Sequence, residues 1–242
     1  MNKKICVAIP HNYIAFDVNF VMSLVAMQDI FFEWIIKNKK EDTLSIVRQS
    51  GYQIDEMRNA LVEVAIKNKM THILFLDTDM SFPQDMIVKM IEDIDDNPKY
   101  EAITGLYVRK TPPYLPHIYP KFLKSKKFGI AGIYPVDSIF PVAGAGMGCC
   151  LIDMKVFKRI EKPYFKSGGS ARGAKKLGED LYFCAKAKPK MLCDTRLVCP
   201  HFKPVGFTPD HYIQSGGLKI KNGNVTGTKK QLDEIAKKYK EI

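Results

Sequence analysis

Short unbroken apolar runs alternate with helically spaced apolar positions through the first hundred residues. Residues 4–10 and 72–76 are continuous apolar runs, typical of strands buried on both faces of a sheet. Residues 18–38 and 55–68 carry apolar side chains at helical spacing, which predicts two helices, the second with Asp55 as its N-cap. This alternation predicts an open α/β sheet with mostly parallel strands.

The same patterns continue less regularly along the rest of the chain. Strands are predicted over 44–47, 102–107 and 191–198, and helices over 155–160 and 179–188. A helix is also predicted to open at Ser81–Pro83, because proline is tolerated in a first helical turn. Residues 161–178 are polar, basic and glycine-rich, which predicts a loop. Thr228 and Gln231 form a capping-box pattern, which predicts the start of a final helix.

Length and composition predict one domain with a modest appendage. The chain has 242 residues, of which 46% are hydrophobic and 26% charged, and this balance allows a sizeable core. We expect an α/β domain over 1–205 and a basic C-terminal extension over 206–242 that ends in an amphipathic helix.

No membrane segment or signal peptide is expected, and the predicted location is cytoplasmic. The longest apolar region, 16–36, is interrupted by acids and amides, and the apolar run near the N-terminus ends at Pro10. The six cysteines include the adjacent pair Cys149–Cys150 and are expected to be reduced thiols. The spacing of Cys193, Cys199 and His201 matches no established zinc motif.

Charge is unevenly distributed between the two parts of the chain. Residues 1–100 contain 11 Lys and Arg against 15 Asp and Glu, a net charge of −4, whereas residues 101–242 have a net charge of +15. No acid lies between Glu101 and Asp137. Such a basic region suits a nucleotide diphosphate, a nucleic acid or an anionic membrane surface. Lysines that serve only solubility would produce the same balance.

The strongest chemical signal is Asp77-Thr78-Asp79, directly after the buried strand 72–76. Ligands of open α/β sheets bind at the carboxyl ends of the strands. Two carboxylates two residues apart on an extended backbone point the same way and can share a divalent cation, which in turn can bridge a diphosphate. The structural alternative is an acidic turn that caps the following helix.

Further candidates lie far along the chain. Asp180 and Glu179 begin a predicted helix, where a carboxylate can act as a general base or simply favour the helix dipole. His201 is a candidate third metal ligand, or a packed histidine. Arg58 and Arg109 can contact phosphates, or serve as surface cations. Three glycines would allow a sugar or phosphate to approach the backbone closely, namely Gly144, Gly146 and Gly148.

Taken in order, these segments resemble the GT-A glycosyltransferases, specifically the family-2-like enzymes of phage and microbial genomes. The resemblance covers about residues 4–203. It rests on Ile9-Pro10, Arg58-Asn59, the segment 73–83 with both aspartates, Gly105–Arg109, Gly146–Ile152, Gly178–Phe183 and Pro200-His201. It implies a soluble enzyme that transfers a hexosyl or pentosyl group from a nucleotide-sugar donor.

The resemblance also implies roles for individual residues. Asp77, Asp79 and His201 would hold Mn²⁺ or Mg²⁺ against the donor diphosphate, and Asp180 would be the base of an inverting reaction, with Glu179 placing the acceptor. The donor-binding set would be Pro10, His11, Asn12, Arg58, Asp77, Thr78, Arg109, Gly144, Gly146 and Gly148. Arg172, Lys175 and Lys176, just before Gly178, are the candidates for acceptor binding.

The sequence leaves several alternatives open. The acidic Asp-Asp-Gly-Ser turn of many family-2 enzymes is absent, with Val47–Gly51 near its place, so UDP is only the first choice of nucleotide. The acceptor is either a polyanion such as hydroxymethylated DNA or a glycan. A nucleotidyltransferase would need a glycine-rich loop where 11–16 stands, and a non-catalytic nucleic-acid-binding protein would explain only the charge. The oligomeric state stays open.

Overall fold

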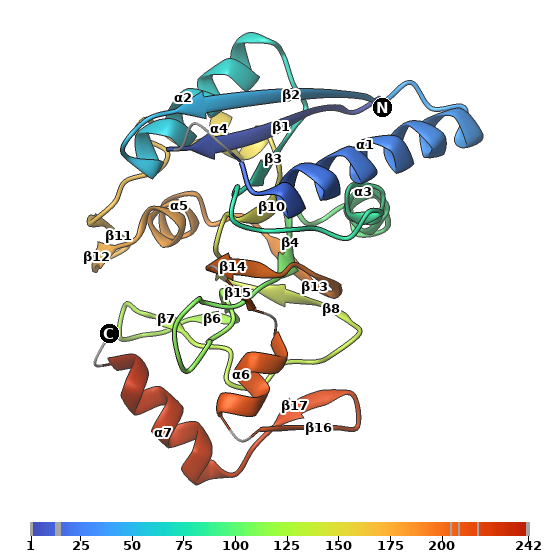
Figure 1. Cartoon of the computed structure of the whole chain (residues 1–242). Coiled ribbons are helices and arrows are strands. Elements are labelled where there is room, and N and C mark those ends of the chain that lie inside the picture. The colour runs from blue at the N-terminus through green and yellow to red at the C-terminus, as the bar shows by residue number, and fades with distance from the viewer. Residues whose placement is uncertain (1, 13–15, 204, 208, 217, 241–242) are drawn as a thin grey trace.

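A seven-stranded sheet forms the centre of the protein (Figure 1). The computed structural model describes residues 2–12, 16–203, 205–207, 209–216 and 218–240. In sheet order the strands are β2 (Thr43–Ser50), β1 (Lys4–His11), β3 (His72–Leu76), β10 (Cys149–Asp153), β4 (Ala102–Leu106), β13 (Met191–Val198) and β8 (Ile139–Val142). β10 and β8 run against the other five strands, so the sheet is mostly parallel as predicted.

Helices cover both faces of this sheet because the side chains of each strand alternate between the faces. Ile5 and Val7 of β1 join the core under α1 (Val18–Asn38) and α3 (Met86–Asp96). Cys6 and Ala8 of the same strand join the core under the helices on the other face. Those helices are α2 (Ile54–Lys67), α4 (Lys155–Lys158) and α5 (Glu179–Ala187).

Short strands and two further helices lie beyond the sheet. The two-stranded pairs are β5 (Ile118–Tyr119) with β9 (Gly144–Ala145), β6 (Lys121–Phe122) with β7 (Phe128–Gly129), β11 (Gly169–Ala171) with β12 (Ala174–Leu177), β14 (His201–Lys203) with β15 (Val205–Phe207), and β16 (Lys219–Lys221) with β17 (Asn224–Thr226). The C-terminal part also holds α6 (Pro209–Ser215) and α7 (Lys229–Lys240). Tyr212 of α6 stacks on Tyr134 at 6.3 Å, which attaches this part to the body.

Most predicted elements are confirmed, including the capping box, in which Gln231 N donates to Thr228 Oγ1 at 3.3 Å. Three predictions are wrong in detail. The N-cap of α2 is Gln53, because the Asp55 carboxylate instead accepts from Ser167 N at 2.8 Å. α3 begins at Met86 rather than at Ser81–Pro83, since Ser81 N donates to Pro200 O at 3.1 Å. The predicted loop 161–178 contains the β11–β12 hairpin.

α1 has the length and composition of a membrane-spanning helix, and among the described helices it alone meets that criterion. It meets the criterion by length and composition only, despite the interruption by Asp29 and Glu33. Phe20, Met27 and Phe31 are buried and attach the helix to the sheet. Its opposite side is open, with Val18 68% exposed and Ile36 78% exposed.

Candidate active site

The Asp-Thr-Asp turn and the glycine-rich segment meet at one edge of the sheet. β10 runs antiparallel to β3, with Cys149 opposite Leu76. The segment before β10 therefore lies beside the turn after β3, and Asp77 N donates to Gly148 O at 3.0 Å. Pro10 and His11 end β1 at the same edge, and Asn12 follows as an exposed residue.

Backbone pairing brings His201 to Asp79 from far along the chain. Phe202 N donates to Asp79 O at 2.7 Å, and Met80 forms a bridge with His201. The His201 Nε2 atom lies 3.4 Å from Asp79 Oδ1. Val108 O accepts a hydrogen bond from His201 Nδ1 at 2.8 Å, which fixes the orientation of the ring and directs Nε2 toward the carboxylate.

Asp77 faces a different partner, the buried guanidinium of Arg58. Arg58 is 1% exposed, and its Nη2 atom lies 3.0 Å from Asp77 Oδ1. Its Nε atom lies 3.7 Å from a carboxylate oxygen of both Glu179 and Asp180. Arg58 therefore joins the two acidic motifs inside the protein, rather than extending into an open nucleobase pocket.

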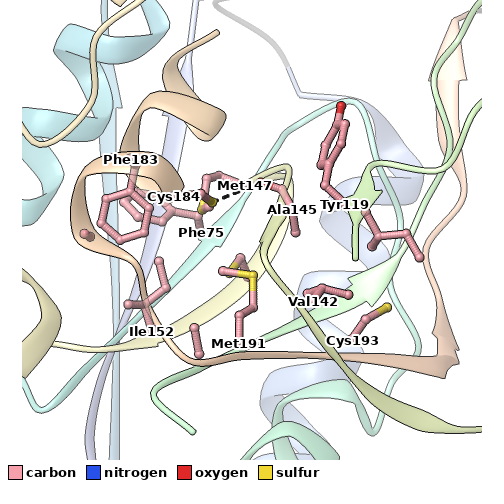
Figure 2. Packing of buried hydrophobic residues seen from close by; sticks show 14 of the residues in the cluster. Phe75, Tyr119, Val142, Ala145, Met147, Ile152, Phe183, Cys184, Met191 and Cys193 are labelled. Atoms are coloured by element: carbon pink, nitrogen blue, oxygen red, sulfur yellow. Dashed lines mark hydrogen bonds between the residues drawn. The ribbon is translucent and has the colours of Figure 1, made fainter. Parts of the chain in front are cut away.

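Aromatic packing holds the start of α5 against β3. Phe183 of α5 stacks on Phe165 at 4.9 Å, and Phe165 contacts Phe75 at 5.4 Å, two residues before Asp77. Figure 2 shows Phe75, Phe183 and Cys184 grouped with Met147 of the glycine-rich segment. The Cys184 thiol donates to Ala145 O at 3.7 Å. Packing of this kind positions Glu179 and Asp180 through the body of the helix.

The carboxylates differ in their pKa values because their surroundings differ. Burial, and then the negative charge of Glu179, raise the pKa of Asp180 well above its ordinary value, while Arg58 opposes the rise. Burial also raises the pKa of Asp77, again against Arg58. For Asp79, burial acts in the raising direction, but hydrogen bonds from His201 and Lys110 prevail and lower its pKa to about 2. Asp79 therefore stays ionised beside Lys110, while Asp180 holds a proton more readily.

The glycines admit protein side chains into the site. A Cβ atom at Gly146 would lie 2.0 Å from Tyr107 Oη, and one at Gly148 would lie 2.7 Å from Met80 Sδ. At Gly144 it would meet the Phe128 ring at 2.7 Å. Tyr107, which lies within the segment Gly105–Arg109 but had no predicted role, accepts a hydrogen bond from Gly148 N at 3.0 Å and lies with its hydroxyl among these residues.

A cleft of about 830 Å³ opens beside Asp180 and Glu179. Its lining includes Arg109, His117 and Gly146, and the predicted acceptor-binding residues Lys175 and Lys176. Arg172, in contrast, lies over the Phe122 ring at 4.2 Å and joins two hairpins. His117 stacks on Tyr107 at 4.8 Å, and burial lowers its pKa to about 3, so its ring is neutral.

Asp79 and His201 provide part of a ligand set for a hard divalent cation. A carboxylate oxygen and an imidazole nitrogen are ligands that Mn²⁺ accepts. Asp77 is held by Arg58, and no group of three His, Cys, Asp or Glu side chains within the described residues forms a metal cluster. The cysteines are free and buried, and Cys199 Sγ lies 3.4 Å from Cys149 Sγ.

Comparison with known proteins supports the fold. The structure is similar to that of A197 from STIV, with a TM-score of 0.59 and 19% identity over 86% of this chain and 91% of that one. Likeness is weaker, at a TM-score of 0.45, to S. aureus TarS in complex with UDP-GlcNAc (12% identity, 88% and 64% covered) and to HddC from Yersinia pseudotuberculosis complexed with GMP-PN (10% identity, 88% and 97% covered). No protein-family model and no curated protein sequence matches the chain.

The predicted open, mostly parallel α/β fold is therefore confirmed, and it is shared with A197 from STIV. At these identities the likeness describes the fold alone, and the reaction has to be argued from the site.

Proposed function

We propose that this protein is a metal-dependent glycosyltransferase that moves a sugar from a nucleotide-sugar donor, with UDP as the first choice of nucleotide, to an acceptor hydroxyl with inversion. The observation that carries the proposal is the pair of contacts made by Arg58. It joins Asp77 of the Asp-Thr-Asp turn to Glu179 and Asp180, and the latter two line an open cleft. The turn proposed to bind the diphosphate therefore lies beside the proposed proton acceptor, Asp180.

In the proposed reaction the acceptor oxygen attacks the anomeric carbon of the donor sugar. The bond between that carbon and the diphosphate oxygen breaks, and the new glycosidic bond forms on the opposite side. In its ionised form Asp180 accepts the proton of the attacking hydroxyl, and the pKa that burial raises makes this carboxylate a stronger base. Asp180 lines the cleft, where an acceptor hydroxyl would reach it.

Charge on the departing diphosphate needs a counterion, and the protein offers one in Lys110. Its ammonium forms a salt bridge with Asp79 and is available to turn toward a bound phosphate. Asp79 and His201 are the residues that would hold Mn²⁺ or Mg²⁺, which would neutralise charge on the leaving group. Arg58 keeps Asp77 and the α5 carboxylates in place.

The acceptor is proposed to be anionic because the cleft beside Asp180 is lined by Arg109 and several lysines. Hydroxymethylated DNA and an anionic glycan would both be acceptors of this kind. DNA binding through such lysines falls steeply with salt, so an affinity that is measurable at about 50 mM salt and lost at about 200 mM would support DNA.

The test of the reaction is release of nucleoside diphosphate from a panel of nucleotide sugars, with Mn²⁺ or with EDTA. Metal-dependent release from one donor would support a glycosyltransferase and identify the nucleotide. A nucleotidyltransferase would instead release pyrophosphate from a nucleoside triphosphate. Absence of release from every donor, together with no donor-induced thermal shift, would refute the proposal.

A further inference from the structure

Two hairpins outside the central sheet wall the cleft beside Asp180. In the first, β6 pairs with β7, and Leu123 N donates to Lys127 O at 2.8 Å across the turn. In the second, β11 pairs with β12 through the turn Arg172-Gly173, whose φ angles are 50° and 79°. Positive φ at both central residues is typical of a type I′ turn, whose twist matches that of the two strands it connects.

The hairpins are fixed to each other at their tips. Arg172 lies over the Phe122 ring at 4.2 Å, a cation–π contact between the turn of the second hairpin and strand β6 of the first. Gly173 also lies close to the Lys126 side chain, 3.4 Å from the position that a Cβ atom would occupy. These contacts hold the walls of the cleft together through Arg172 and the methylene carbons of Lys126, not through lysine ammonium groups.

Four lysines project from these walls, Lys126 and Lys127 from the first hairpin, and Lys175 and Lys176 from the second. The lysines that form salt bridges in the described part of the chain are others, namely Lys3, Lys89, Lys110, Lys155 and Lys162. With Arg109, five cationic side chains line the cleft, against the carboxylates of Glu179 and Asp180 alone among its described lining residues. A ligand with a high density of negative charge would pair with these cationic side chains.

The dimensions of the cleft argue against a nucleic acid. Its volume of about 830 Å³ falls in the range of small-molecule pockets, about 300–1,000 Å³. Enzymes that act on a base of duplex DNA take it out of the stack and hold it against aromatic side chains. The phenolic and phenyl rings of the lining, Tyr119 and Phe128, are only 3% and 7% exposed.

We propose that this lysine cleft is the acceptor site and takes a sugar or polyol that carries a phosphate group, with a free hydroxyl placed at Asp180. The inference rests on the proposed glycosyl transfer and narrows its acceptor. A phosphate monoester carries about 1.5 to 2 negative charges near neutral pH, more than a carboxylate, and it accepts hydrogen bonds on three oxygens. Lysine ammonium groups bind such an oxyanion as point charges.

Calorimetry with glucose 6-phosphate at about 50 mM salt tests binding without turnover, against glucose and glucuronate. The test variant is K126Q/K127Q/K175Q/K176Q. The matched control is K121Q/K124Q, which removes exposed lysines of the same hairpin region that are not part of the cleft lining. Each lost hydrogen bond to a charged group weakens binding by at least about tenfold. We expect glucose 6-phosphate to bind, glucose not to bind, and the test variant to lose at least about tenfold in affinity while the control stays within about twofold.

Turnover with different acceptors distinguishes a soluble phosphate ester from a lipid-linked one. Release of nucleoside diphosphate is measured with glycerol, glycerol 3-phosphate, vesicles of phosphatidylglycerol, and a hydroxymethylated DNA duplex. Stimulation by glycerol 3-phosphate supports a soluble acceptor, and stimulation by the vesicles alone supports a lipid-linked one. A duplex that stimulates better than either, tighter binding of glucuronate, or equal loss in the control variant would overturn the inference. If no donor is cleaved but the calorimetric result holds, the glycosyltransferase proposal fails and the phosphate site stands.

Discussion

The buried Arg58 guanidinium and the partly buried Asp77 carboxylate form an ion pair, with 3.0 Å between Nη2 and Oδ1. The Nε atom of the same guanidinium lies 3.7 Å from both Glu179 and Asp180, yet Nε and Asp180 Oδ1 have no hydrogen-bond partner among the described residues. Three acids thus share one buried cation. Removing that cation would leave several negative charges uncompensated inside the protein.

We expect Arg58→Met to lower the free energy of unfolding by about 3–5 kcal/mol, the usual cost of breaking a buried ion pair by removing one partner. Urea unfolding measures this change. Arg48→Met, at an exposed position of β2, serves as the control and should change stability by less than about 0.5 kcal/mol. Equal effects of the two variants would show that Arg58 does not hold the acidic motifs together.

Asp180→Asn should abolish most turnover while donor binding persists. Loss of general-base catalysis costs about 10² to 10⁴ in rate, and the amide is nearly isosteric with the carboxyl group. Released nucleoside diphosphate measures turnover, and a donor-induced thermal shift measures binding. Turnover within a few-fold of the wild type would remove Asp180 from the mechanism and favour a retaining pathway.

The same substitution should stabilise the folded protein at higher pH, although it abolishes most turnover. The pKa of Asp180 is raised in the folded protein, so folding favours its neutral form. Its contribution to stability is complete below the ordinary carboxyl pKa and is lost as pH rises through the folded value. We therefore expect Asp180→Asn to be more stable than the wild type at pH 8, with a difference that shrinks toward pH 4. Melting temperatures over this range test the expectation, with the exposed Asp137→Asn as control.

Metal affinity should depend more on Asp79 and His201 than on Asp77. The Asp79 carboxylate and His201 Nε2 face each other at 3.4 Å, whereas Asp77 is engaged by Arg58. Titration calorimetry with Mn²⁺ should show at least about tenfold weaker binding for Asp79→Ala and for His201→Ala. A larger loss in Asp77→Ala than in either would show that Asp77 leaves Arg58 to bind the metal.

Gly146→Ala should destabilise the protein by about 1–3 kcal/mol, the usual cost of overpacking. Its Cβ atom would lie 2.0 Å from the Tyr107 hydroxyl and would displace that ring from Gly148. Gly129→Ala is a suitable control, because its nearest contact is an ordinary 3.5 Å. Thermal unfolding compares the two, and an unperturbed Gly146→Ala would mean that Tyr107 moves away freely.

Local sequence patterns predicted the strands and helices whose buried positions follow the strand or helix period, such as β1, α1 and β13. They failed where a distant segment decides the conformation. Residues 79–81 pair with 200–202, which delays the start of α3 until Met86. The β11–β12 hairpin also escaped prediction, because its turn is Arg172-Gly173 and not the usual Asn-Gly or Asp-Gly.

The candidate site shows the same limit. Its acidic residues were predicted because each stands at the end of a strand or the start of a helix, which the sequence reveals. The partner of Asp77 could not be predicted, since Arg58 reaches it only through the packing of α2 on the sheet. No role was predicted for Tyr107 or His117, and their proximity depends on the fold of the segment between β4 and β10.

β10 lies between β3 and β4 and pairs with both, so the long segment from 107 to 148 begins and ends at neighbouring strands, and within it β8 joins the sheet at its edge beside β13. Its two ends are anchored, and the β6–β7 hairpin lies in its middle. Insertions or exchanges within that hairpin would leave Asp77, Asp79 and Asp180 where they are. The segment is therefore a suitable place for grafting, where the lining of the cleft can be changed without moving these three aspartates.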